Sequence, residues 1–208
     1  MESSLKGLLK NNSDIYQSPD DIFYSPDDLL YNHQKFLKQY FTSSQKSDLL
    51  VSLAWLFALI NRFHMPMEDL LWRRYAYKCP HCLDIPCICD NLDERPTKKT
   101  GRPPVGKPET VDQWQQIIQK IYPNIKKEEM SKKALSSLEN IQSSLRTFIR
   151  EKRKTQHREL ESKITDYLVT MIGLYNITKL NIFAEYQAMF SHGCYVCHKT
   201  PCECNFFE

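Results

Sequence analysis

The sequence is poor in glycine, in long apolar runs and in net charge. Only 5 of its 208 residues are glycine, which disfavours the sandwiches and barrels that need many tight turns and favours helices. The longest apolar run, residues 49–60, is too short to cross a bilayer and is typical of a buried helix. The formal net charge of +3 does not by itself predict a nucleic-acid partner.

The N-terminal stretch MESSLKGLLKNN also lacks the apolar core and the small-residue cleavage site of a secretory signal peptide. We therefore expect a cytoplasmic protein that makes no contact with a membrane. In a reducing compartment, closely spaced cysteines are more often metal ligands than disulfides.

Cysteine is absent from most of the chain and concentrated in two stretches, KCPHCLDIPCICD (78–90) and GCYVCHKTPCECN (193–205). Both stretches have the spacing Cys-x2-Cys-x4-Cys-x-Cys. The candidate metal ligands are Cys79, Cys82, Cys87 and Cys89 in the first cluster, and Cys194, Cys197, Cys202 and Cys204 in the second.

Four thiolates this close in sequence can surround one tetrahedral Zn²⁺ ion. Because four cysteines would fill every coordination position, the spacing favours a structural zinc over a catalytic zinc, which keeps one position open. Disulfides and a redox-active Cys-x-x-Cys are the alternatives. Three nearby histidines, His81, His192 and His198, are candidates to replace a ligand.

The repeat extends beyond the cysteines. An offset of 115 residues, without gaps, aligns residues 48–89 with residues 163–204 so that apolar positions face apolar positions, as Leu53 faces Leu168. We predict an internal duplication with a first module at 1–90 and a second at 111–208. A linker rich in proline and lysine, 91–110, would join the two modules.

The modules are predicted to be helical throughout. Apolar residues recur at helical spacing in 48–63 and 164–175, and shorter helices are expected at 66–75 and 181–190. Upstream of these, helices are expected at 25–41, 110–122 and 132–152. The predicted fold class is therefore all-α.

The segments AWLFALINR and DLLWRRY, followed by a Cys-Pro-x-Cys-x4-Cys-x-Cys cluster, resemble the MazG-like all-α nucleoside-triphosphate pyrophosphohydrolases, in particular their tandem, cysteine-bearing members. The resemblance covers most of the chain but matches residues 1–28 poorly. It implies that the two copies pair within the chain as a pseudo-dimer. It also implies that active members bind Mg²⁺ through Glu-Glu-x-x-Glu on one helix and Glu-x-x-Asp on the next.

This sequence departs from both acidic motifs. The three glutamate positions of the first motif correspond to Tyr31, Asn32 and Lys35 in the first copy, and to Ser136, Ser137 and Asn140 in the second. The Glu-x-x-Asp positions correspond to Asp48 and Val51, and to Lys163 and Asp166. Only Asp48 and Asp166 remain as vestigial candidates, so the resemblance implies a retained fold and lost chemistry.

The function expected from these observations is a catalytically degenerate scaffold, regulatory or nucleotide-sensing subunit with a protein partner. One alternative is an active Mg²⁺-dependent pyrophosphohydrolase, and another is a zinc module that binds nucleic acid. A basic stretch, 146–158, could contact the phosphates of a nucleotide or nucleic acid. Its candidate residues are Arg146, Arg150, Lys152, Arg153, Lys154 and Arg158.

Overall fold

The computed structural model describes residues 2–89, 106–123 and 126–204. Within these residues the chain forms eight α-helices and no strand, which confirms the predicted all-α class. Most of the predicted linker, 91–105, lies outside the described residues.

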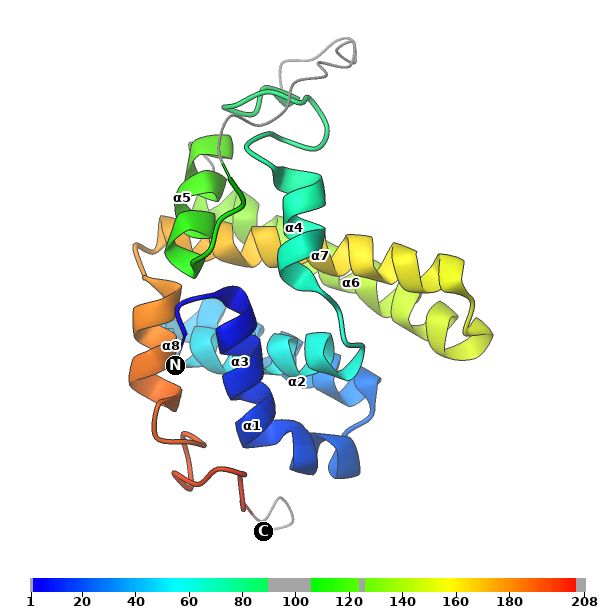
Figure 1. Ribbon diagram of the computed structural model, residues 1–208, viewed down its shortest axis with the longest axis vertical. Helices are drawn as coiled ribbons and strands as arrows, with labels where there is room; N and C mark the ends of the chain where they lie inside the picture. Colours follow the sequence, from blue (N-terminus) through cyan, green and yellow to red (C-terminus); the bar gives the residue numbers. More distant parts are fainter. Residues whose placement is uncertain (1, 90–105, 124–125, 205–208) are drawn as a thin grey trace.

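The helices fall into two runs, each followed by a cysteine cluster (Figure 1). The N-terminal half contains α1 (Leu5–Phe23), α2 (Pro26–Ser43), α3 (Lys46–Arg62), α4 (Met67–Tyr75) and the first cluster. The C-terminal half contains α5 (Val111–Ile121), α6 (Lys127–Glu151), α7 (Lys154–Ile177), α8 (Ile182–Phe190) and the second cluster.

Side chains just before the first turn define where several helices begin. Ser4 accepts a hydrogen bond from the Gly7 amide at the start of α1, and Thr110 accepts one from the Gln113 amide at the start of α5. Ser25 and Asp28 form a reciprocal capping box at α2. These caps satisfy amides that have no partner within the helix.

The sequence pattern did not predict helix α1. Pro19 lies inside this helix, where its missing N–H normally argues against helical structure. The helix is nevertheless held in place because Leu5, Leu8 and Ile15 are buried on its inner face. Tertiary burial here outweighs an unfavourable local sequence.

The two halves share one hydrophobic core. Helices α2 and α3 form one antiparallel hairpin, α6 and α7 form another, and α2 packs against α6. Helix α4 crosses over from the N-terminal half to pack against α7 (Figure 1). Among the described residues, one cluster of buried apolar side chains runs through both halves.

None of the helices in the described ranges is by itself long and apolar enough to span a membrane. Helices α3 and α4 meet the length and composition requirements only when taken together, as a pair bent by 99°.

Candidate metal centres and the acidic positions

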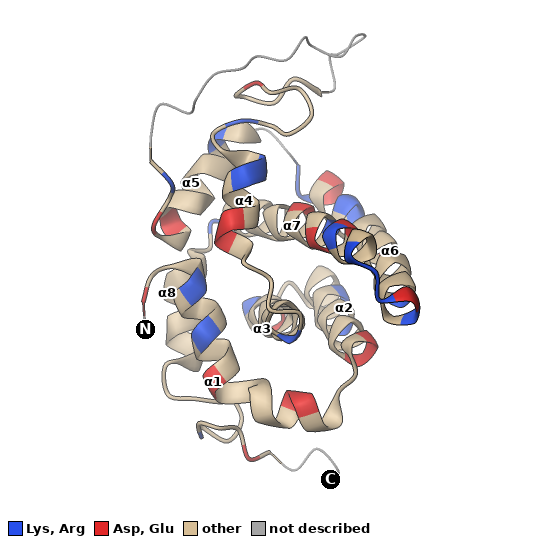
Figure 2. Cartoon of the chain, turned by 45° about the vertical axis from the view of Figure 1, so that its right-hand side comes forward, with Lys and Arg blue, Asp and Glu red and all other residues tan. Residues whose placement is uncertain are grey.

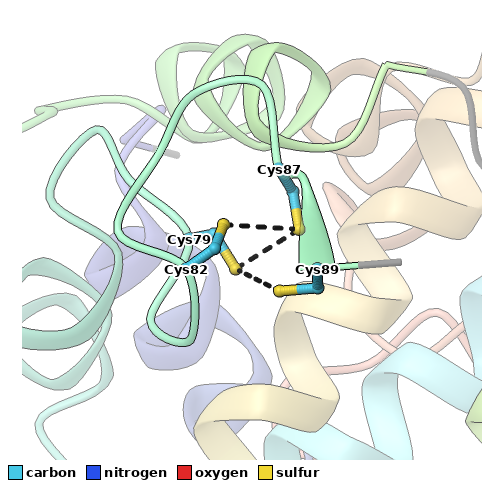
Figure 3. A group of neighbouring side chains, drawn as sticks. All are labelled: Cys79, Cys82, Cys87 and Cys89. Carbon is cyan, nitrogen blue, oxygen red and sulfur yellow. Dashed lines mark hydrogen bonds between the residues drawn. The ribbon is translucent and has the colours of Figure 1, made fainter. Parts of the chain in front are cut away.

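The sulfur atoms of the first cluster converge on one point (Figure 3). The Sγ atom of Cys79 lies 3.4 Å from that of Cys87 and 3.6 Å from that of Cys89, and the Cys82 and Cys87 sulfurs are 3.9 Å apart. A tetrahedral zinc site with Zn–S bonds of about 2.3 Å places its sulfurs about 3.8 Å apart. The observed spacing fits one metal ion, and all four cysteines are free rather than disulfide-bonded.

The second cluster repeats this arrangement. Its Cys194 and Cys204 sulfurs are 3.7 Å apart, and its Cys197 and Cys202 sulfurs are 3.9 Å apart. In each cluster all four sulfurs lie within 4.8 Å of one another, so each could hold a metal ion. The three neighbouring histidines are members of neither group, and the eight predicted cysteines are therefore the ligand candidates that the structure brings together.

The same backbone turn presents the first two cysteines of each cluster. The Leu83 amide donates to the Cys79 carbonyl oxygen at 2.9 Å, and the His198 amide donates to the Cys194 carbonyl oxygen at 2.8 Å. Leu83 and His198 both adopt left-handed backbone angles, with φ of 62° and 57°. This tight turn explains how a Cys-x-x-Cys pair directs both sulfurs toward one centre.

The electrostatics of the sulfurs favour a bound cation. Burial acts to raise the pKa of Cys79, but the amides of Cys82 and His81 and the hydroxyl of Tyr122 outweigh it and lower the pKa to about 7. Burial raises the pKa values of Cys89 and Cys204 to about 11. Thiols with raised pKa values, such as Cys89 and Cys204, ionise near neutral pH only if a cation shares their charge.

Each cluster is attached to the opposite half of the molecule. The Cys87 amide donates to the Ile121 carbonyl oxygen at 2.7 Å, and the Cys202 amide donates to the Ile15 carbonyl oxygen at 2.7 Å. Ile121 is the last residue of α5, so its carbonyl has no helical partner. Ile15 lies four residues before Pro19, which has no N–H to offer. The clusters thus satisfy two carbonyls that their own helices leave unpaired.

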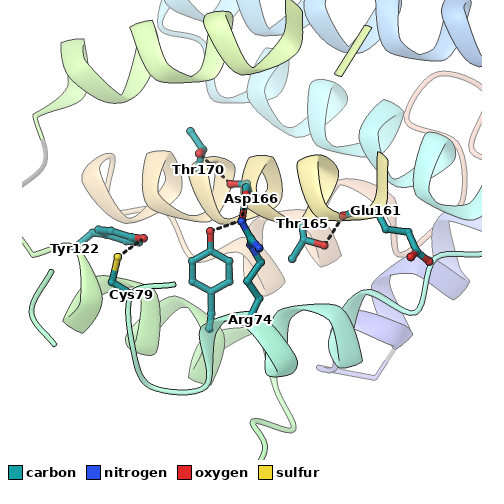
Figure 4. A network of polar contacts seen from close by, with 8 residues as sticks. Arg74, Cys79, Tyr122, Glu161, Thr165, Asp166 and Thr170 are labelled. Atoms are coloured by element: carbon teal, nitrogen blue, oxygen red, sulfur yellow. Dashed lines mark hydrogen bonds and ion pairs between the residues drawn. The ribbon is translucent and has the colours of Figure 1, made fainter. Parts of the chain in front are cut away.

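A tyrosine of the opposite half also touches each cluster. The Tyr122 hydroxyl donates to the Cys79 sulfur at 3.6 Å (Figure 4). Tyr16 is hydrogen-bonded to Cys194, and its hydroxyl oxygen accepts from the Tyr195 amide at 3.4 Å. Burial raises the pKa of both Tyr16 and Tyr122, so both hydroxyls keep their protons as donors to sulfur.

Asp166, one of the two vestigial acidic candidates, is fully engaged by α4 (Figure 4). Arg74 donates to both of its carboxylate oxygens, from Nε to Oδ1 and from Nη2 to Oδ2, the latter at 2.6 Å. The Tyr75 hydroxyl donates to Oδ1 at 2.7 Å. This bidentate pair links the two halves and neutralises the carboxylate. No motif in the sequence marked Arg74 or Tyr75 as its partners.

The other residues that were compared with the acidic motifs, Asp48 and Lys163, have partners nearby in the sequence. Asp48, in the first turn of α3, accepts a hydrogen bond from the Ser43 hydroxyl at 2.8 Å. Lys163 pairs with Glu159 at 2.7 Å and contacts the Ser144 hydroxyl at 2.5 Å. The structure places neither Asp48 nor Asp166 in a group of three or more potential metal ligands among the described residues.

The six predicted phosphate-contacting residues do lie together. All are exposed, and they surround the connection between α6 and α7, where the hairpin projects from the body of the molecule (Figure 2). Acidic residues partly neutralise this tip. Arg150 and Arg153 pair with Glu151 at 3.2 and 3.9 Å, and Arg146 pairs with Asp27 at 3.6 Å.

Sequence reasoning missed a buried polar network at the centre of the core. His33 is fully buried, and its Nδ1 lies 2.7 Å from the Ser52 carbonyl oxygen. Its Nε2 lies 2.5 Å from the hydroxyl of Tyr167, which belongs to α7. Burial lowers the pKa of His33 to about 4. A single histidine on an apolar helix face carries no signal from which this cross-half contact could have been predicted.

Comparisons of the chain with models of protein families, with curated proteins and with solved structures found no match. The resemblance to MazG-like proteins therefore stays a prediction.

Proposed function

We propose that this protein is a catalytically inactive, MazG-like helical scaffold that serves as a regulatory or nucleotide-sensing subunit of a larger assembly. Its halves would be tandem copies of one module, paired within the chain as a pseudo-dimer. Each cysteine cluster would hold one structural Zn²⁺ ion.

Repeated contacts support the duplication. The Asn61 side-chain amide donates to the Leu9 carbonyl oxygen at 2.9 Å, and the Asn176 side-chain amide donates to the Gln115 carbonyl oxygen at 2.9 Å. The attachment of each cluster to the opposite half is repeated in the same way. Two copies that arose from an ancestral dimer would retain such reciprocal contacts.

The observation that carries the loss of activity is the bidentate pairing of Asp166 with Arg74. Mg²⁺ prefers several carboxylate oxygens, and in nucleotide enzymes it commonly binds them together with substrate phosphates. Arg74 and Tyr75 already occupy both oxygens of Asp166. Lys163 places a positive charge at the other position of the same motif, where it disfavours a cation.

Zinc would act here as a cross-link. Four cysteines leave no position open for water, so a bound ion would stabilise the fold rather than activate a nucleophile. Because each cluster is hydrogen-bonded to the other half, a bound ion would stiffen the junction between the halves as well as its own loop.

The exposed tip of the α6–α7 hairpin supports a sensing role. Lysine and arginine side chains gathered on one protruding turn can contact the phosphates of a nucleotide without any chemistry. We expect the double variant Lys152→Glu, Lys154→Glu to weaken nucleotide binding measured by calorimetry. Lys120→Glu, an exposed change in the last turn of α5, is the matched control.

The decisive experiment is an assay of pyrophosphate release by zinc-loaded protein. A panel of ribo- and deoxyribonucleoside triphosphates would be supplied with Mg²⁺ or Mn²⁺. We expect release at the level of the protein-free blank. Metal-dependent release that disappears in the Asp48→Ala, Asp166→Ala double variant would overturn the proposal and restore the active-enzyme alternative.

A further inference from the structure

Two adjoining cavities lie between α1 and α3, and the first of them also reaches the second cysteine cluster. The first, of about 70 Å³, is walled by the aromatic side chains Tyr16, Trp55 and Tyr195 and by cysteines of the cluster. The second, of about 80 Å³, has mixed polar and apolar walls and is lined by residues that include Asn12, Asn61 and Arg62. Asp20 and Ala58 line both cavities and form the boundary between them.

Asp20 is a buried carboxylate without a hydrogen-bond donor. Its side chain belongs to a residue that is only 6% exposed, and no residue in the described ranges donates a hydrogen bond to its carboxylate oxygens. The nearest cation, Arg62, is already engaged, because it pairs with Asp21 at 2.8 Å and donates to the backbone oxygens of Asp20 and Tyr24. Burial raises the pKa of Asp20 to about 7, as expected for a carboxylate with too few partners.

The surroundings of Asp20 select a positively charged ligand. A four-thiolate cluster remains net negative even with a divalent ion bound, so it repels anions from the first cavity. The faces of tyrosine and tryptophan rings attract cations. A free carboxylate at the boundary adds a counter-charge in a site of low dielectric constant, where charge pairing is strong.

The first cavity further favours a cation that has no N–H groups to satisfy. A primary ammonium group brings three donors, whereas the walls of this cavity are aromatic rings, aliphatic side chains and sulfur, with a single carboxylate. A methylated ammonium group is apolar on its surface and charged overall, which matches those walls.

We propose that the first cavity binds the methylated ammonium group of a small organic cation, with Asp20 as its counter-ion and Tyr16, Trp55 and Tyr195 as its aromatic walls. The site goes beyond the proposed scaffold role and does not depend on loss of catalysis. It requires both halves, because Tyr195 comes from the second cluster and the other walls come from α1 and α3.

Calorimetric titration of the zinc-loaded protein with choline tests this assignment. The neutral isostere 3,3-dimethylbutan-1-ol has the same shape without the charge. We expect saturable binding of choline and binding of the alcohol weaker by about tenfold or more. Asp20→Asn should weaken choline binding by about tenfold, whereas Asp21→Asn, an exposed neighbour paired with Arg62, should change it less than about twofold.

The source of the ammonium group is distinguished by a second ligand, a short peptide that carries trimethyl-lysine. Binding of choline alone indicates a free small molecule, and binding of the peptide indicates a protein side chain; both outcomes support the site. Trp55→Leu should weaken either ligand, with Trp72→Leu as the control. Equal affinity for choline and its neutral isostere, no effect of Asp20→Asn in a folded variant, or no saturable binding of either ammonium ligand would overturn the proposal.

Discussion

Protonation of His33 should destabilise the fold by a calculable amount. The ring is buried between α2, α3 and α7 and contacts the Ser52 carbonyl oxygen through Nδ1. A carbonyl oxygen can only accept, so Nδ1 carries the proton and Nε2 accepts from the Tyr167 hydroxyl. Adding a second proton would remove the acceptor at Nε2 and place an unpaired charge in the core.

The magnitude follows from the pKa of His33, which burial lowers from 6.5 to about 4. Below pH 6.5 the unfolded chain binds a proton that the folded protein does not bind until about pH 4. Stability is therefore complete above pH 6.5 and is lost as the pH falls through this window. The loss is about 1.4 kcal/mol per pH unit and reaches a limit of about 3 kcal/mol.

Urea unfolding of the zinc-loaded wild type and of His33→Gln, from neutral pH down to about pH 5, measures this loss of stability. Groups that titrate in both proteins, including the cysteines, contribute equally to both free energies of unfolding, so their contributions cancel when one free energy is subtracted from the other. That difference should shrink as the pH falls. The matched control is His64→Gln, a substitution of the same kind at an exposed position. A pH-independent difference for His33→Gln would refute the claim that His33 is buried in its neutral form.

Two further perturbations test the cross-links between the halves. Cys82→Ser should reduce the zinc content from two ions per chain to one and lower the melting temperature, because metal binding and folding are coupled. The control His81→Ala, at an exposed position, should change neither the zinc content nor the melting temperature. Unchanged zinc content in Cys82→Ser would contradict the structural-zinc proposal. Arg74→Ala should lower the free energy of unfolding by about 1–2 kcal/mol, since it leaves the half-buried carboxylate of Asp166 with a single donor. The exposed neighbour Arg73→Ala should cost less than about 0.5 kcal/mol in urea unfolding, and equal losses for the two variants would argue against the cross-half pair.

The cysteine groups could be predicted from the sequence because their geometry is local. All four ligands of a cluster lie within eleven consecutive residues, so any compact turn brings them together. Most helices were predictable for a similar reason, since apolar residues repeat along them at helical spacing. Helix α1 was not predicted because Pro19 interrupts its helical pattern. The helix is stabilised by packing against α3 and α4 rather than by the helix propensity of its sequence.

The partners of the polar side chains could not be predicted in this way. Arg74 and Asp166 are 92 positions apart in the chain, and His33 and Tyr167 are 134 apart. No periodic pattern connects such positions. The motif comparison singled out Asp166 as an acidic candidate, but only the fold shows that Arg74 of the other half pairs with it.

The sequence by itself determined what depends on neighbours along the chain: the helical class and the two cysteine groups. The tertiary structure alone decided which groups meet across the halves. It sets a cluster amide against the carbonyl that Pro19 leaves unpaired, and among the described residues it gives the buried Asp20 carboxylate no hydrogen-bond donor. The physical reason is that burial and hydrogen-bond pairing are properties of packed surfaces, and these surfaces form only when distant segments come together.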